Sequence, residues 1–147
     1  MSTEIYPITP SLVFIEFCVN DSEAGAQTNG EALIRAIRTN LPNTNIAMIF
    51  FGDYTSPGTD LTNLHASTLQ VYHDLCEHYS IPYVDMNAEL ARAIGASEYI
   101  ITNYTTDFIH PTTFGGARAA ELLQSIITSS LVLGGTQTGA LPDPLYP

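Results

Sequence analysis

Two short polar segments carry residue types that could catalyse acyl transfer. Asp107 and His110 stand three residues apart, and Pro111 follows the histidine directly. A histidine can take a proton from a nucleophile and return it to a leaving group, while a carboxylate fixes the imidazole tautomer. The other segment contains Asn20, whose amide could donate a hydrogen bond to an oxyanion. Together these residues predict part of a hydrolytic site.

Neither segment is specific by itself. An Asn-Asp pair that follows a strand, here Asn20 and Asp21, is typical of a turn. An Asp-x-x-His sequence such as Asp107 to His110 is also common in surface loops and at helix caps. The interpretation as an active site therefore depends on whether the surrounding elements bring the two segments together.

Apolar and polar residues are arranged in blocks that predict strands and helices in alternation. The expected strands cover residues 12–17, 46–51 and 83–86, and the expected helices cover 28–40, 60–79 (with Asp60 as N-cap), 87–94 (with Asn87 as cap) and 114–130. Residues 97–113 are expected to form a loop, and residues 131–147, rich in Gly, Thr and Pro, a tail or linker outside a domain at 1–130. This alternation indicates an α/β fold with a parallel sheet covered by helices on both faces. Ligands of such sheets bind beyond the carboxyl ends of the strands, where Asn20 is expected.

The charge balance excludes several classes of partner. The chain has 15 acidic residues, four arginines and no lysine, for a net charge of −11. Such a surface repels nucleic acid and anionic lipid but is compatible with a neutral ester substrate. A phosphate-binding flavodoxin-like domain is also disfavoured, because acidic Asp21 and Glu23 follow the first expected strand. No apolar run approaches the length of a membrane span.

The cysteines and most histidines have simple structural interpretations. Cys18 is expected at the end of the first strand and Cys76 in a helix, as two buried thiols, with a disulfide as the alternative. His65, His73 and His78 share one expected helix. Their offsets of eight and five residues do not place them on one face, so no metal site is predicted.

The two polar segments, taken with their spacing, resemble a known enzyme family. Residues 14–21 resemble the third conserved block of the SGNH (GDSL-like) hydrolases, which are serine esterases and lipases. Residues 107–111, followed by Gly115 and a helix, resemble the fifth block, which carries the acid and base of the catalytic triad. Residues 77–85 are similar to the family's segment entering a late strand. The resemblance covers roughly residues 11–130.

This resemblance implies a three-layer, flavodoxin-like SGNH hydrolase fold and the hydrolysis of a small ester, a lipid ester or an acetylated sugar, with no metal or cofactor. It implies that His110 is the general base, that Asp107 orients it, and that Asn20 completes the oxyanion hole.

The chain also departs from the family pattern. The first block of the family is a strand followed by Gly-Asp-Ser, which carries the nucleophile, and only ten residues precede the first apolar run here. We therefore expect an N-terminally incomplete fold whose nucleophile lies outside this chain. Ser22 is the alternative nucleophile, although its 85-residue interval to Asp107 suits the spacing from the third block to the fifth.

Two further expectations follow from this departure. A non-catalytic remnant or binding module of the same fold is the alternative function. The open sheet edge beside residues 12–17 would permit self-association.

Overall fold

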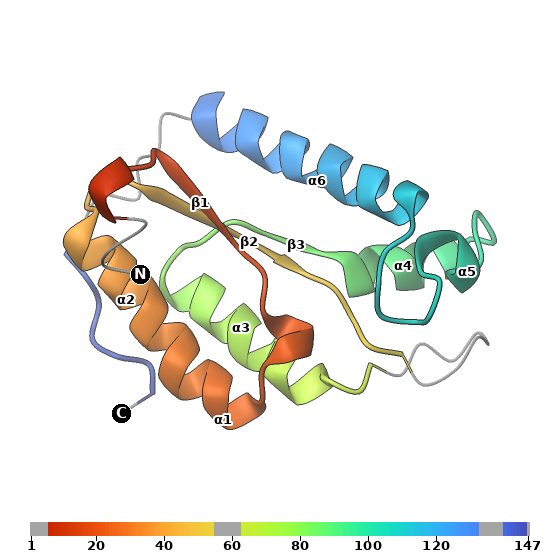
Figure 1. Ribbon diagram of the computed structural model, residues 1–147, viewed down its shortest axis with the longest axis horizontal. Coiled ribbons are helices and arrows are strands. Elements are labelled where there is room, and N and C mark those ends of the chain that lie inside the picture. The colour runs from red at the N-terminus through yellow and green to blue at the C-terminus, as the bar shows by residue number, and fades with distance from the viewer. Residues whose placement is uncertain (1–5, 55–62, 133–139, 147) are drawn as a thin grey trace.

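The computed structural model describes residues 6–54, 63–132 and 140–146. It has a central sheet between two layers of helices (Figure 1). Helices α1 (Glu23–Gly25), α2 (Glu31–Asn40) and α3 (Ala66–His78) cover one face, and α6 (Thr113–Val132) covers the other. The expectation of an α/β fold with helices on both faces of a parallel sheet is confirmed.

The sheet consists of β1 (Leu12–Ile15), β2 (Asn45–Phe50) and β3 (Tyr83–Asp85), in the order β1-β2-β3. Both neighbouring pairs are parallel, with Phe14 opposite Ala47 in the first pair. Because the strands are parallel, their carboxyl ends lie at the same edge of the sheet. Within the described residues, β1 pairs on one side only.

The helices lie close to the predicted ranges. In chain order they are α1 (Glu23–Gly25), α2 (Glu31–Asn40), α3 (Ala66–His78), α4 (Met86–Gly95), α5 (Ile101–Tyr104) and α6 (Thr113–Val132). The described residues also form three short helical turns. These are the 3-10 turns η1 (Tyr6–Ile8) and η2 (Cys18–Asn20) and the π-turn η3 (Ala26–Gly30). No helix in these described ranges is both long enough and apolar enough to cross a membrane.

Three local predictions are wrong. The first strand ends at Ile15, and Cys18 lies in η2, because the chain turns where the Asn20 N–H donates to the Phe17 carbonyl at 2.9 Å. The predicted loop over 97–113 contains α5, which is too short to produce a periodic pattern. The cap of α4 is Asp85 rather than Asn87. The predicted cap Asp60 lies outside the described residues.

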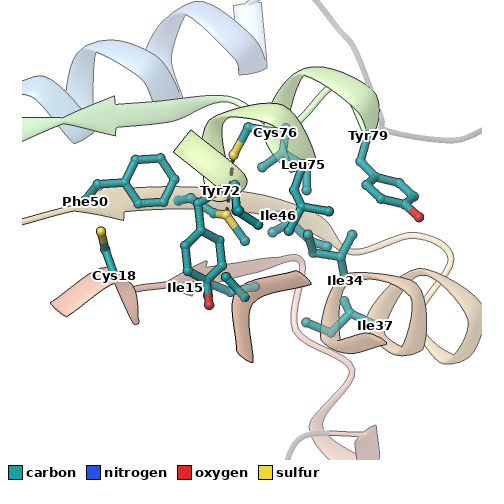
Figure 2. Packing of buried hydrophobic residues seen from close by; sticks show 14 of the residues in the cluster. Ile15, Cys18, Ile34, Ile37, Ile46, Phe50, Tyr72, Leu75, Cys76 and Tyr79 are labelled. Carbon is teal, nitrogen blue, oxygen red and sulfur yellow. Dashed lines mark hydrogen bonds between the residues drawn. The ribbon is translucent and has the colours of Figure 1, made fainter. Parts of the chain in front are cut away.

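Two apolar clusters hold the layers together. The first lies between the sheet and α2 with α3, where Ile34 and Ile37 of α2 meet Leu75 of α3 (Figure 2). The second lies on the opposite face, where Leu122 and Ile126 of α6 pack over the sheet. β2 contributes alternate side chains to the two clusters, with Met48 and Phe50 in the first and Ile49 in the second, whereas β1 contributes only to the first.

Both cysteines are free and buried, so the disulfide alternative is wrong. The thiol of Cys76 donates to the Met48 sulfur at 3.4 Å. Burial raises the pKa of each thiol to about 12, and nearby Glu16 adds to the effect at Cys18. Neither thiol is therefore available as a thiolate nucleophile at neutral pH.

Candidate active site

Asp107 and His110 form the hydrogen-bonded pair that the sequence suggests. Oδ2 of Asp107 lies 2.7 Å from Nδ1 of His110. Oδ1 of the same carboxylate accepts the backbone N–H groups of Ile109 at 3.2 Å and His110 at 2.8 Å. Because Nδ1 is held by the carboxylate, Nε2 is the nitrogen that can accept a proton.

These contacts also fix the charge of the carboxylate. The hydrogen bond from the His110 side chain, followed by the backbone N–H groups of His110 and Ile109, lowers the pKa of Asp107 to about 2. Asp107 is thus ionised at any pH at which the protein would work. An ionised carboxylate at this position can stabilise an imidazolium while it forms.

The loop that carries the pair is closed at its base. Thr105 and Pro111 form an antiparallel bridge, and the Thr106 N–H donates to the His110 carbonyl at 3.3 Å. Phe108 has a positive φ of 70°, which is unfavourable for a side chain of its size. Its N–H donates to Oγ1 of Thr105 at 3.0 Å, and this hydrogen bond stabilises the strained backbone of Phe108.

Contacts with β2 and α5 fix the position of this loop. The Tyr54 N–H, four residues beyond the end of β2, donates to the Phe108 carbonyl at 3.1 Å. The Thr112 N–H donates to the Tyr104 carbonyl at 2.7 Å. A Cβ at Gly115 would lie 2.4 Å from that same carbonyl oxygen, so only glycine lets α6 begin this close to α5. The close packing of α6 against Tyr104 therefore requires a glycine at position 115, which follows the Asp107–His110 segment in the sequence.

Asn20 lies at the edge of the sheet where the strands end. It is the last residue of η2, five residues beyond β1, and it is exposed. The loop of Asp107 and His110 is hydrogen-bonded to Tyr54, just beyond β2, so both segments lie at the carboxyl ends of the neighbouring parallel strands β1 and β2. The direct convergence of Asn20 with His110 stays a prediction.

Ser22 and Asp21 have structural contacts in the described chain. The Ser22 hydroxyl accepts the Gly25 N–H at 3.1 Å and so caps α1. Asp21 accepts the Tyr72 hydroxyl through Oδ2 at 2.9 Å and the Ser22 N–H through Oδ1 at 2.9 Å. These contacts shape the turn after η2. The role of Ser22 as an alternative nucleophile stays a prediction.

A polar network beside the loop was not predicted from the sequence. Oδ1 of Asn87 accepts the Tyr54 hydroxyl at 2.8 Å and the amide of Asn63 at 3.0 Å. A Cβ at Gly52 would lie 2.0 Å from this Asn87 oxygen. The sequence indicates Asn87 only as a helix cap, because nothing in its local sequence points to contacts with residues 24 and 33 positions away.

The other histidines contact separate carboxylates. Nε2 of His65 lies 3.7 Å from Asp53, and Nε2 of His73 lies 3.2 Å from Asp85. The His73 ring also stacks on Tyr83 with centroids 4.8 Å apart. In the described ranges, no three His, Cys, Asp or Glu side chains are grouped to hold a metal ion.

Comparison with known proteins identifies the fold. No family model and no curated protein sequence matches the chain. Two crystal structures of a two-domain esterase (CEX) active on acetylated mannans match 98% and 99% of this chain, with TM-scores of 0.78 and 0.71 and identities of 21% and 23%. The first of these was co-crystallised with mannopentaose. A Lactobacillus plantarum protein matches 88% of this chain and 72% of its own, with a TM-score of 0.61 and 18% identity.

These similarities, at such low identity, show the fold alone. The chain has the α/β fold of these esterases. It spans only 36% and 37% of the length of the two esterase chains.

Proposed function

We propose that this chain supplies the acid–base pair and the oxyanion-binding amide of an SGNH-type serine ester hydrolase. The observation that carries the proposal is the Asp107–His110 pair, with Nδ1 bound to the carboxylate at 2.7 Å. This arrangement leaves Nε2 of His110 as a base at an accessible position, because the His110 side chain is 75% exposed.

The proposed reaction has two steps. Nε2 of His110 removes the proton of a serine hydroxyl as the serine oxygen attacks the ester carbonyl carbon. The imidazolium then gives this proton to the leaving alcohol, and the acyl group stays on the serine. In the second step, His110 takes a proton from water as the water oxygen attacks the acyl carbon, and the imidazolium then gives this proton to the serine oxygen as the acyl–serine bond breaks and the acid is released. Asn20 would donate to the oxyanion in both steps.

The serine is proposed to lie in a segment that this chain does not contain. Both described cysteines are excluded as nucleophiles by burial, and the Ser22 hydroxyl accepts a hydrogen bond as a helix cap. The sequence pattern around Asn20 corresponds to the family's third block rather than to its first.

The proposed substrate class is a neutral carboxylic ester. A net charge of −11 disfavours anionic substrates. The esterase of the same fold that acts on acetylated mannans supports an acetylated sugar over a lipid ester.

One observation favours the alternative, a non-catalytic module of the same fold. Among the residues that the structure describes, the His110 ring makes its hydrogen bond to Asp107 through Nδ1, and no hydroxyl is hydrogen-bonded to Nε2. An acid–base pair without a nucleophile does not by itself cleave esters.

An experiment separates the two functions. Acetate release from acetylated mannan is measured for the gene product that includes any sequence encoded upstream of Met1, and for its His110→Ala variant. Loss of about 10⁴-fold or more in kcat is expected for the variant, whereas the matched change His78→Ala, in a histidine at the end of α3, should leave kcat unchanged. Equal activity of the His110→Ala variant and the unchanged protein would exclude the proposed mechanism.

A further inference from the structure

Three apolar side chains are exposed beside the loop of the Asp107–His110 pair. Tyr99, Ile100 and Phe114 are 38%, 65% and 39% exposed. The rings of Tyr99 and Phe114 have centroids 4.8 Å apart and are tilted by 55°. Tyr104, only 3% exposed, meets both rings edge-on beneath them, at 5.9 Å and 5.4 Å. We call Tyr99, Ile100 and Phe114 the aromatic platform.

The backbone around the platform is held by hydrogen bonds. The Glu98 N–H donates to the Ala93 carbonyl at 2.9 Å, which fixes the turn at the end of α4. The Ile100 N–H donates to Oδ1 of Asn103 at 3.0 Å, which fixes the start of α5. At the other side, the close approach of Gly115 to Tyr104 fixes Phe114 at the start of α6. The platform is therefore formed before any ligand binds, which lowers the entropy cost of binding.

The platform lies within reach of the candidate base. Phe114 is four residues beyond His110, which limits the separation of their Cα atoms to about 14 Å. The hydrogen bond from Thr112 to Tyr104 anchors the chain between them. A ligand on the platform would thus lie next to the loop that carries His110.

The small area of the platform and the negative charge of the chain limit which ligands can bind there. Aromatic side chains present about 150–250 Å², so these three partly exposed side chains offer on the order of 300 Å² or less. A stable protein interface needs about 800 Å² from each partner, so a second protein is too large a ligand for this patch. The net charge of −11 disfavours an anionic ligand. A flat, uncharged ring with an apolar face and polar edges fits both limits, and a pyranose is such a ring.

We propose that the aromatic platform binds a neutral pyranose ring of a glycan and holds the neighbouring acetylated unit near His110. The role of the platform in positioning the ester rests on the proposed function. The binding of the sugar ring does not, because it requires neither the nucleophile nor the acid–base pair.

The test is an NMR titration of the 147-residue chain with mannopentaose. We expect saturable shifts of the backbone signals of Tyr99, Ile100 and Phe114. Tyr99→Leu and Phe114→Leu keep an apolar contact with Tyr104 but remove a ring, and each should weaken binding about five-fold. Tyr99→Phe and Phe114→Tyr keep the rings and should stay within about two-fold. Ile8→Ala, at an exposed apolar residue near the opposite end of the chain, is the control for non-specific effects.

The outcomes distinguish this proposal from the proposed function. Retained mannopentaose binding in His110→Ala, together with its loss in the leucine variants, supports the platform whether or not esters are cleaved. Absence of saturable binding overturns the platform and leaves the esterase proposal standing. Equal binding in the leucine and ring-retaining variants also overturns it, as do platform signals that shift with protein concentration alone, which would indicate a second copy as the ligand.

Discussion

The carboxylate of Glu31, in the first turn of α2, accepts the hydroxyl of Tyr79 at 2.6 Å although Glu31 is only 3% exposed. The same carboxylate accepts the backbone N–H groups of Leu145 at 2.6 Å and Tyr146 at 2.9 Å. One buried acid therefore ties the segment 140–146 to the layer of α2 and α3, which Figure 1 shows side by side with it. The predicted boundary between a domain at 1–130 and a tail at 131–147 stays a prediction.

Glu31→Ala should destabilise the protein by about 2–4 kcal/mol, because it leaves a buried hydroxyl and two N–H groups without their acceptor. Glu31→Gln keeps one acceptor oxygen and should lose less. The free energy of unfolding in urea is the measurement, and Glu77→Ala, at an exposed position of α3, should change it by no more than about 0.5 kcal/mol. A loss below 1 kcal/mol for Glu31→Ala would contradict this role.

Asp107 should titrate near pH 2 in the folded protein, because its carboxylate accepts hydrogen bonds from His110 and Ile109. Since the folded-state pKa lies below the unfolded value of about 3.9, the ionised group favours folding above pH 4. That contribution disappears as the pH falls through about 2. Carboxyl-carbon NMR measures the midpoint, and His110→Ala should raise it. An unchanged midpoint in that variant would mean that the pair is not formed.

Asn20→Ala should lower kcat by about 10²- to 10³-fold in the active protein and change KM little, because an oxyanion donor acts mainly in the transition state. Asn45→Ala, an amide change at the far end of the sheet, is a control for loss of structure when both variants are compared by thermal unfolding. Normal kcat in Asn20→Ala would remove Asn20 from the site.

The isolated 147-residue chain should show little or no hydrolysis of a short-chain aryl ester, because none of the residues that the structure describes supplies an activated nucleophile to His110. The measurement is initial rate against the uncatalysed rate. Robust turnover that Ser22→Ala abolishes would reverse this prediction and make Ser22 the nucleophile.

Among the residues that the structure describes, β1 pairs on one side only, and this open edge should make the isolated chain associate. Phe14 on this strand is 47% exposed, and an unpaired apolar edge is a template for another strand. The net charge of −11 opposes association between copies, so the associated fraction should increase as salt screens the charge. Size-exclusion chromatography across a range of ionic strength measures this fraction, and Phe14→Glu should reduce it. A monodisperse monomer with cooperative thermal unfolding at every salt concentration would contradict the prediction.

Local sequence was sufficient for most of the secondary structure and for one half of the site. Apolar runs and their periods predict the three strands and α2, α3, α4 and α6, because these elements are long enough to show a pattern. Asp107 and His110 could be paired from the sequence because three residues in one loop are close wherever the loop lies. The missed α5 has four residues and no period of its own.

Only the tertiary structure decided which distant residues meet. Glu31 contacts Tyr146, 115 positions away, and the tilted rings of Tyr99 and Phe114 are in contact although the two residues lie in different segments. The sequence contains no local signal for these pairs, because each depends on how α2, α5 and α6 pack against the sheet and each other. Composition and periodicity determine which residues are buried and in which element. Long-range packing determines which buried or exposed side chains become neighbours, and therefore where a ligand can bind.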